Sequence, residues 1–227
     1  MHIDTLKKYV INLKRRPDRL LNFYETFPFY DYEIVYGFDG KNYENETDEE
    51  KEMFDRFTNN LNCGEKGVFI SHLRIYRDIV EKNIPYAMIL EDDPILCENF
   101  KERLTKVVEE LPDDFNIFYF GGRFTPEFKM DEGSYIRITD NIVAHHPSKI
   151  DLTSDNYNRG TFGYIISNSF AKAIITLFKL KCHYYIPLDH WLIQYSIFNR
   201  LEILNSYPLL CHSPASSLDS DIRGKNT

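Results

Sequence analysis

The chain has 227 residues, of which 43% are hydrophobic and 15% are aromatic. This length and this apolar content suit one compact domain with a sizeable buried core. Acidic residues outnumber basic ones by 35 to 27, which gives a formal net charge of -8. Such a surface repels a phosphate backbone on average, so the composition argues against nucleic acid as a partner.

The N-terminal residues lack the apolar segment of a secretory signal peptide, and no apolar run approaches the roughly 18 residues that span a bilayer. The four cysteines match neither a metal-binding pattern nor a disulfide-rich framework, and we interpret them as free thiols. We therefore expect a cytoplasmic protein without a membrane span. A position at the periphery of a membrane stays open. The cysteines are Cys63, Cys97, Cys182 and Cys211.

Strands and helices are predicted to alternate through the first half of the chain. Four apolar or β-branched runs are typical of buried strands: 8–13, 33–38, 86–90 and 116–120. Apolar residues recur at the helical period over 64–82 and 100–111, and another helix is expected from Asp18. The acidic stretch 44–52 indicates a solvated loop or a helix start. The alternation predicts an α/β fold with a mixed, mostly parallel sheet flanked by helices, and ligands beyond the carboxyl ends of the strands.

The second half predicts shorter strands and two more helices. The strands are expected at 135–138, 142–144 and 161–167, and the helices at 169–180 and 188–198. The last residues are polar and resemble a frayed end. We therefore expect a single domain over 1–218, followed by a polar C-terminal tail over 219–227.

Three consecutive carboxylates, Glu91, Asp92 and Asp93, follow the strand predicted at 86–90 and precede Pro94. Carboxylates gathered at a sheet edge repel one another unless a cation is present. Mg²⁺ and Mn²⁺ prefer oxygen ligands and often take one or two carboxylates together with phosphate oxygens. If the strand persists, Glu91 and Asp93 share one face and Asp92 the other. The alternative is an acidic cap for the next helix, and the spacing alone does not decide between the two.

Several motifs occur in an ordered series along nearly the whole chain. They are YVINLKRRPDRL at 9–20, GFDG at 37–40, GEKGVFISHLRIYRDIV at 64–80, MILEDD at 88–93, GTFGYIIS at 160–167, PLDHWL at 187–192, and His212-Ser213. With these motifs the chain resembles glycosyltransferase family 25, which contains bacterial lipooligosaccharide galactosyltransferases and collagen hydroxylysine galactosyltransferases. The resemblance implies a GT-A-type nucleotide-sugar fold. It also implies transfer of a hexose from a UDP-sugar to a hydroxyl with inversion at the anomeric carbon.

The resemblance places a metal site at the acidic triplet, which matches the family's aspartate-rich motif. It implies Glu91 and Asp93 as ligands of Mn²⁺ or Mg²⁺ and Asp92 as a donor contact, although the first position is Glu where the family has Asp. His212 is expected to supply an imidazole ligand to the same ion. The ion would bridge the donor phosphates and stabilise the charge on the leaving diphosphate. For His212, an ordinary hydrogen-bonded or surface histidine is the alternative.

The remaining donor contacts are expected along the same motifs. Arginine side chains at the end of the first strand suit phosphate, although they could equally be surface charges. Ser71 and His72 are neighbours on a helix and do not share a face, so at most one points at the donor, and a core or capping role is the alternative for both. For residues 39–40, a turn without a donor contact is the alternative. For residues 160–161, the alternative is a turn that leads into the next strand. The full set is Asn12, Leu13, Arg15, Arg19, Asp39, Gly40, Ser71, His72, Asp92, Gly160 and Thr161.

Inverting transfer needs a base that takes the proton of the acceptor hydroxyl, and a carboxylate can do this. Asp189 lies at a predicted helix start, where an N-cap aspartate is equally expected, and the family motif favours catalysis. Trp191 could stack on a sugar or belong to the core.

The predicted function is transfer of galactose or glucose from a UDP-sugar to a lipooligosaccharide-like saccharide or to hydroxylysine of a collagen-like protein. A non-catalytic nucleotide-sugar- or glycan-binding relative is the alternative. A nucleotidyltransferase should carry a Gly-rich phosphate loop after its first strand, and LKRRPDR is not one.

Overall fold

The computed structural model describes residues 1–122, 133–146, 158, 160–179 and 186–212. The boundary predicted at 218, the tail at 219–227 and Cys182 lie outside these residues. The main sheet consists of β1 (Lys7–Asn12), β2 (Tyr32–Tyr36), β3 (Tyr86–Glu91), β5 (Ile117–Tyr119), β7 (Tyr135–Arg137), β8 (Ile142–His145), β9 (Gly163–Ser167) and β10 (Ile203–Ser206). Its eight strands lie in the order β2-β1-β3-β9-β5-β10-β8-β7.

A second, three-stranded sheet has the order β4-β11-β6, formed by β4 (Ile95–Leu96), β6 (Gly121–Gly122) and β11 (Cys211–His212). The helices are η1 (Ile3–Thr5), α1 (Pro17–Thr26), α2 (Asp48–Arg56), α3 (Cys63–Glu81), α4 (Phe100–Glu110), α5 (Asn168–Lys179) and α6 (Leu188–Phe198). Within the described ranges, none of these helices combines the length and the apolar character needed to cross a membrane.

The main sheet is mixed. Strand β1 pairs in parallel with β2 and β3, and β5 pairs in parallel with β10. Strand β9 is antiparallel to both β3 and β5, and β8 is antiparallel to both β10 and β7. Six of the eight strands therefore run in one direction, because only β8 and β9 are reversed. The predicted fold class, a mixed and mostly parallel sheet flanked by helices, is confirmed.

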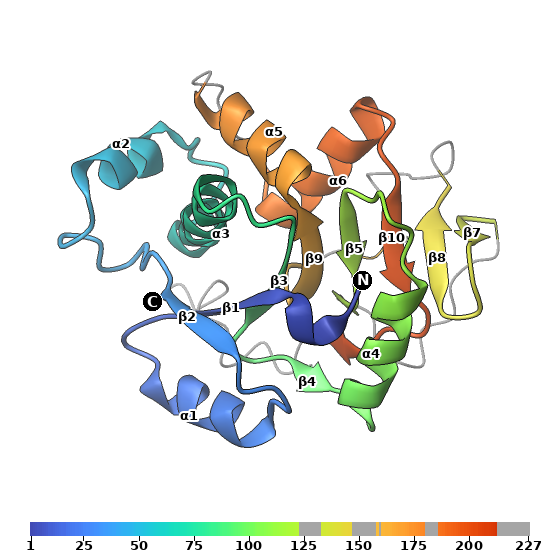
Figure 1. Cartoon of the computed structure of the whole chain (residues 1–227). Helices are drawn as coiled ribbons and strands as arrows, with labels where there is room; N and C mark the ends of the chain where they lie inside the picture. Colours follow the sequence, from blue (N-terminus) through green and yellow to red (C-terminus); the bar gives the residue numbers. More distant parts are fainter. Residues whose placement is uncertain (123–132, 147–157, 159, 180–185, 213–227) are drawn as a thin grey trace.

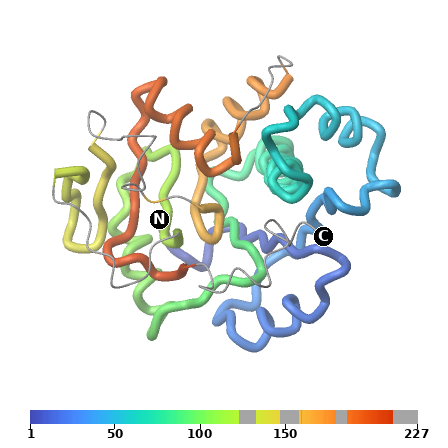
Figure 2. The backbone as a smooth tube through the Cα atoms, turned by 180° about the vertical axis from the view of Figure 1, so that it is seen from behind, coloured from blue at the N-terminus to red at the C-terminus, as the bar shows by residue number. Residues whose placement is uncertain are grey.

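Helices cover both faces of this sheet (Figure 1). Successive side chains of a strand point to opposite faces, so Tyr9 and Ile89 pack with α3, α5 and α6, whereas Val10 and Leu90 pack with α1 and α4. The view from behind in Figure 2 shows the same arrangement, with α1 and α4 below the sheet and α3 and α5 above it. Strands buried on both faces explain why the first-half strands read as continuous apolar runs.

Two helices on one side of the sheet start with reciprocal capping. The Asn62 side chain accepts a hydrogen bond from the Glu65 backbone N–H, and the Glu65 side chain accepts one from Asn62 at the start of α3. Thr47 and Glu50 form the same arrangement at α2. The acidic stretch at 44–52 therefore contains a helix start, one of the two structures predicted for it.

The carboxyl ends of β1, β2, β3 and β5 meet at one edge of the sheet, since these strands run in one direction. Strand β9 runs the other way and begins at this edge, with Gly163 opposite Leu90. Residues just after β1 and β3 and just before β9 are thereby brought together. In an open α/β sheet, ligands bind at this edge.

Candidate functional site

The acidic triplet lies at the end of β3, and the strand stops at its first member, Glu91. Asp92 and Asp93 both turn towards α1, where the Arg19 guanidinium lies 2.8 Å from Asp93 Oδ2 and 3.4 Å from Asp92 Oδ1. The alternation expected for a persisting strand does not apply, because β3 ends at Glu91, two residues before Asp93.

Asn12 joins the end of β1 to the triplet. Its side-chain amide donates hydrogen bonds to Asp92 Oδ2 at 2.6 Å and to the Arg16 carbonyl at 3.0 Å, and only 2% of the residue is exposed. Pro17 occupies the first position of α1, where its fixed φ and missing N–H suit a helix start. The helix thus begins directly after the strand, and its first turn brings Arg19 back over the carboxylates.

Glu91 points to the opposite side of the sheet from Asp92. Its Oε1 accepts a hydrogen bond from the Thr161 hydroxyl, which lies just before β9. Burial, together with repulsion from Asp93 and more weakly from Asp92 and Asp189, raises the pKa of Glu91 to about 8. In the absence of a bound cation, this carboxyl keeps its proton at neutral pH.

The charge balance at the triplet is negative. Burial and repulsion from Asp93 raise the pKa of Asp92 to about 6, although Asn12 and Arg19 both act in the opposite direction. One arginine therefore compensates the neighbouring carboxylates only in part.

The oxygen ligands of the triplet suit Mg²⁺ or Mn²⁺, and the surplus negative charge fits such an ion. His212 lies in β11 and pairs with Ile95 of β4. Ile95 follows Asp93 by two residues in the chain. The described part of the chain holds no preassembled group of three ligating side chains. A cation here would take the rest of its ligands from phosphate or water, as Mg²⁺ commonly does.

Asp189 is the second residue of α6 and lies near the triplet. Its negative charge is the weakest of the charges that raise the pKa of Glu91, and it also raises the pKa of Tyr119. The N-cap of α6 is Pro187, which makes no side-chain capping bond. The alternative role of Asp189 as the N-cap residue is therefore wrong.

Tyr76, Tyr119 and Tyr164 are buried in the same core cluster. The Tyr164 hydroxyl lies 2.6 Å from His72 Nδ1 and 2.7 Å from the Tyr76 hydroxyl. The Tyr119 hydroxyl, also buried, makes no hydrogen bond within the described residues. The sequence does not predict this cluster, because a tyrosine in an apolar strand or helix is an ordinary core residue. Only the hydroxyl, which needs a hydrogen-bond partner when buried, indicates a polar contact.

Ser71 and His72 point to different places, as neighbours on a helix must. The Ser71 hydroxyl accepts a hydrogen bond from the Phe38 backbone N–H at 2.8 Å and donates one to the Gly67 carbonyl at 2.6 Å. His72 is fully buried, and burial lowers its pKa to about 3, so the ring is neutral. Ser71 fixes the segment after β2, whereas His72 supports β9 through Tyr164.

The loop after β2 carries the other donor candidates. Asp39 accepts a hydrogen bond from Arg15 Nε at 2.6 Å, which links this loop to the end of β1. Gly40 lies against the start of α3, where a Cβ atom would come within 1.9 Å of the Cys63 carbonyl oxygen. Leu13 is half-buried beside this loop.

Two residues before β9 complete the predicted donor set. Gly160 has φ of +112°, a conformation that favours glycine. Thr161 follows with its hydroxyl on Glu91. Trp191 lies apart from both and stacks on Tyr195, with ring centroids 5.4 Å apart.

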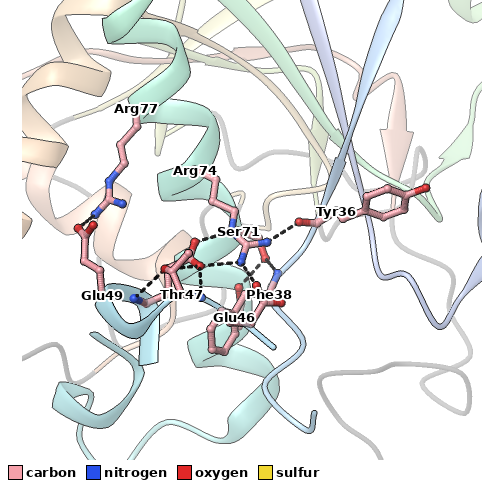
Figure 3. A network of polar contacts seen from close by, with 10 residues as sticks. Tyr36, Phe38, Glu46, Thr47, Glu49, Ser71, Arg74 and Arg77 are labelled. Atoms are coloured by element: carbon pink, nitrogen blue, oxygen red, sulfur yellow. Dashed lines mark hydrogen bonds and ion pairs between the residues drawn. The ribbon is translucent and has the colours of Figure 1, made fainter. Parts of the chain in front are cut away.

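An arginine-centred network holds the loop after β2 and helix α2 against α3 (Figure 3). Arg74 donates to Glu50 Oε1 at 2.6 Å, to Glu46 Oε2 at 2.5 Å and to the Tyr36 carbonyl at 2.6 Å. The Glu50 side chain is only 9% exposed. This network spans the loop that carries Asp39, so it fixes one border of the site.

We expect Arg74→Met to lower the free energy of unfolding by about 3 kcal/mol, because it leaves the buried Glu50 charge without its main partner. The matched control is Arg77→Met on the same helix, whose partner Glu49 is 65% exposed, and it should cost less than about 1 kcal/mol. Urea unfolding of both variants measures the difference. Equal losses would contradict a structural role specific to Arg74.

The raised pKa of Glu91 makes stability depend on pH. The folded protein keeps this proton up to about pH 8, whereas the unfolded chain releases it near the ordinary value of 4.5. The contribution of Glu91 is therefore intact below that lower value and is lost as pH rises through about 8. We expect Glu91→Gln to gain stability relative to the wild type as pH rises.

Urea unfolding in the presence of a chelator, from about pH 5 to about pH 9, measures this difference. Comparison of the two proteins at each pH removes the contributions of all groups that they share. A difference that stays constant with pH would show that Glu91 is ionised throughout.

Comparison with known proteins gives a consistent family. The model of "Glycosyltransferase family 25 (LPS biosynthesis protein)" matches residues 5–192. Procollagen galactosyltransferase 2 of Mus musculus is 27% identical over 181 residues, which is 74% of this chain and 27% of that protein. Procollagen galactosyltransferase 1-B of Xenopus laevis is 28% identical over 196 residues, which is 81% of this chain and 30% of that protein.

A glycosyltransferase 25 family member of Drosophila melanogaster is 27% identical over 197 residues, covering 81% of this chain and 29% of that protein. The chain thus spans less than a third of the length of these relatives. The solved structure of the inositol-1-phosphate CTP transferase from T. maritima has a TM-score of 0.46 and 13% sequence identity, covering 95% of this chain and 92% of that chain. Because the family model matches 188 of the 227 residues (5–192), the chain belongs to glycosyltransferase family 25.

Proposed function

We propose that this chain transfers galactose or glucose from a UDP-sugar to a hydroxyl of a saccharide or of hydroxylysine, with inversion at the anomeric carbon and with Mn²⁺ or Mg²⁺ as cofactor. One observation supports the proposal: the acidic triplet meets Arg19 at the carboxyl edge of the sheet in a member of glycosyltransferase family 25. The names of the relatives, which are galactosyltransferases, support galactose as the sugar to test first.

In this proposal the donor diphosphate lies beside the triplet. Asp93 is the main carboxylate ligand of the cation, with Glu91 and His212 as the other candidate ligands. The bound cation supplies Lewis-acid stabilisation of the charge on the leaving diphosphate. Arg15 and Arg19 add positive charge at the same edge, where guanidinium groups suit phosphate oxygens.

The nucleoside half of the donor is assigned to the opposite border of the site. Asn12 and Asp39 supply polar groups there, and the network around Arg74 keeps the loop of Asp39 in place. Fixed polar groups of this kind hold a ligand without having to reorganise during the reaction.

Asp189 is the proposed base. It takes the proton from the acceptor hydroxyl while that oxygen attacks the anomeric carbon from the face opposite the leaving UDP. Asp189 belongs to α6 and Arg19 to α1, so the proposed base and the proposed stabiliser of the leaving group come from different helices.

The test is UDP release from UDP-galactose and UDP-glucose, each with a lipooligosaccharide acceptor and with a hydroxylysine peptide. We expect release that depends on one acceptor, stops with EDTA and returns with Mn²⁺. No release with any combination would count against the proposal. UDP-sugar binding without turnover would favour the non-catalytic alternative, and pyrophosphate release from a nucleoside triphosphate and a sugar phosphate would favour a nucleotidyltransferase.

A further inference from the structure

We propose that Arg19 is a built-in counter-ion that occupies the cation position at the triplet, gives up Asp93 when the divalent cation binds, and then turns to the donor diphosphate. This inference rests on the metal dependence in the proposed function and deepens it. Arg19 would contact the carboxylates when the cation is absent and the donor diphosphate when the cation is bound.

The contacts of Arg19 define the first state. Its Nη1 lies 2.8 Å from Asp93 Oδ2 and 3.4 Å from Asp92 Oδ1, so one guanidinium bridges two consecutive carboxylates. The three side chains are 14%, 22% and 8% exposed, respectively, which keeps water from screening the attraction. Arg19 therefore offsets part of the negative charge of Asp92 and Asp93.

A divalent cation and this guanidinium compete for the same oxygen. A Mg²⁺-like ion on Asp93 Oδ2 would bind at about 2.1 Å the oxygen that the Arg19 nitrogen already contacts at 2.8 Å. Two cations on one oxygen in a half-buried site repel each other strongly. Binding of the ion to this oxygen of Asp93 would therefore weaken the guanidinium contact and favour movement of the Arg19 side chain.

The other two carboxylates of the triplet have hydrogen bonds that do not involve Arg19. Asn12 holds Asp92 through a separate hydrogen bond of 2.6 Å, so this carboxylate keeps its orientation after the guanidinium leaves. Thr161 holds Glu91 independently. Arg19 itself lies in the first turn of α1 at the edge where the diphosphate is proposed to bind, and a planar guanidinium can meet two phosphate oxygens.

The test is Mn²⁺ affinity, measured by electron paramagnetic resonance of free Mn²⁺ without nucleotide. We expect Arg19→Gln to bind Mn²⁺ on the order of 10-fold more tightly than the wild type, a typical size for coupling between two ligands of one site. UDP binding in saturating Mn²⁺, measured by calorimetry, should become weaker in the same variant. The control is Arg77→Gln on α3, which loses an ion pair with Glu49 rather than with the triplet and should leave Mn²⁺ affinity unchanged.

A second variant, Arg19→Lys, keeps the charge and protects the test against misfolding of Arg19→Gln; its Mn²⁺ affinity should lie between the other two. Equal Mn²⁺ affinities in the wild type and Arg19→Gln, or weaker binding in the variant, would overturn this inference alone. No Mn²⁺ binding in either protein would overturn it together with the metal dependence. Tighter Mn²⁺ binding in Arg19→Gln, in a protein that never releases UDP, would support the inference while the proposed transfer fails.

Discussion

Replacement of Asp189 by Asn is expected to lower kcat by about 10²- to 10⁴-fold, the usual contribution of a general base, while UDP binding stays within about twofold. The amide keeps the shape of the side chain but cannot accept the proton of the acceptor hydroxyl. The change also removes a negative charge that raises the pKa of Glu91 and of Tyr119. Acceptor-dependent UDP release gives kcat, and calorimetry gives the UDP affinity.

The control for this variant is Asp48→Asn. Asp48 is the first residue of α2 and is fully exposed, so it tests the loss of an acidic side chain in the first turn of a helix. That loss removes only a favourable contact of an exposed carboxylate with the helix dipole. A kcat of Asp189→Asn close to that of Asp48→Asn would exclude Asp189 as the base.

Replacement of Asp93 by Asn is expected to lower activity by about 10²- to 10³-fold and to abolish the effect of Mn²⁺ on UDP binding. The variant loses the carboxylate that meets Arg19 at 2.8 Å and that is proposed as the main ligand of the cation. Steady-state UDP release and calorimetry with and without Mn²⁺ give the two quantities.

Asp114→Asn serves as the control for this second change, since Asp114 is an exposed residue in the loop before β5. It should leave both activity and the Mn²⁺ effect unaltered. Normal activity of Asp93→Asn, with the Mn²⁺ effect preserved, would remove Asp93 from the metal site.

The predicted helices and strands all have counterparts in the structure because each is marked by a local period. Strand β10 was missed for a physical reason. It is only four residues long and ends in Asn205 and Ser206, two polar residues that suggest a loop. Both are buried and hydrogen-bonded, Asn205 to Asn158 and Ser206 to the Phe120 carbonyl, and these partners are distant in sequence.

The place of the triplet could be predicted because it directly follows a buried strand. Its contacts could not, since they depend on where other strands end. Thr161 reaches Glu91 only because β9 inserts antiparallel between β3 and β5, an order that no local pattern reveals. The orientation of Asp93 depended on whether the strand continued, and the strand stops at Glu91, two residues before it.

The position of β10 between β5 and β8 determines where the chain can be shortened. The family match ends at residue 192, before this strand begins at Ile203. A fragment ending there would leave β5 with an open row of backbone N–H and C=O groups and would detach the β7–β8 hairpin from its neighbour. Open strand edges pair with other chains, so such a fragment would aggregate, and a fragment intended for expression needs the residues through β10.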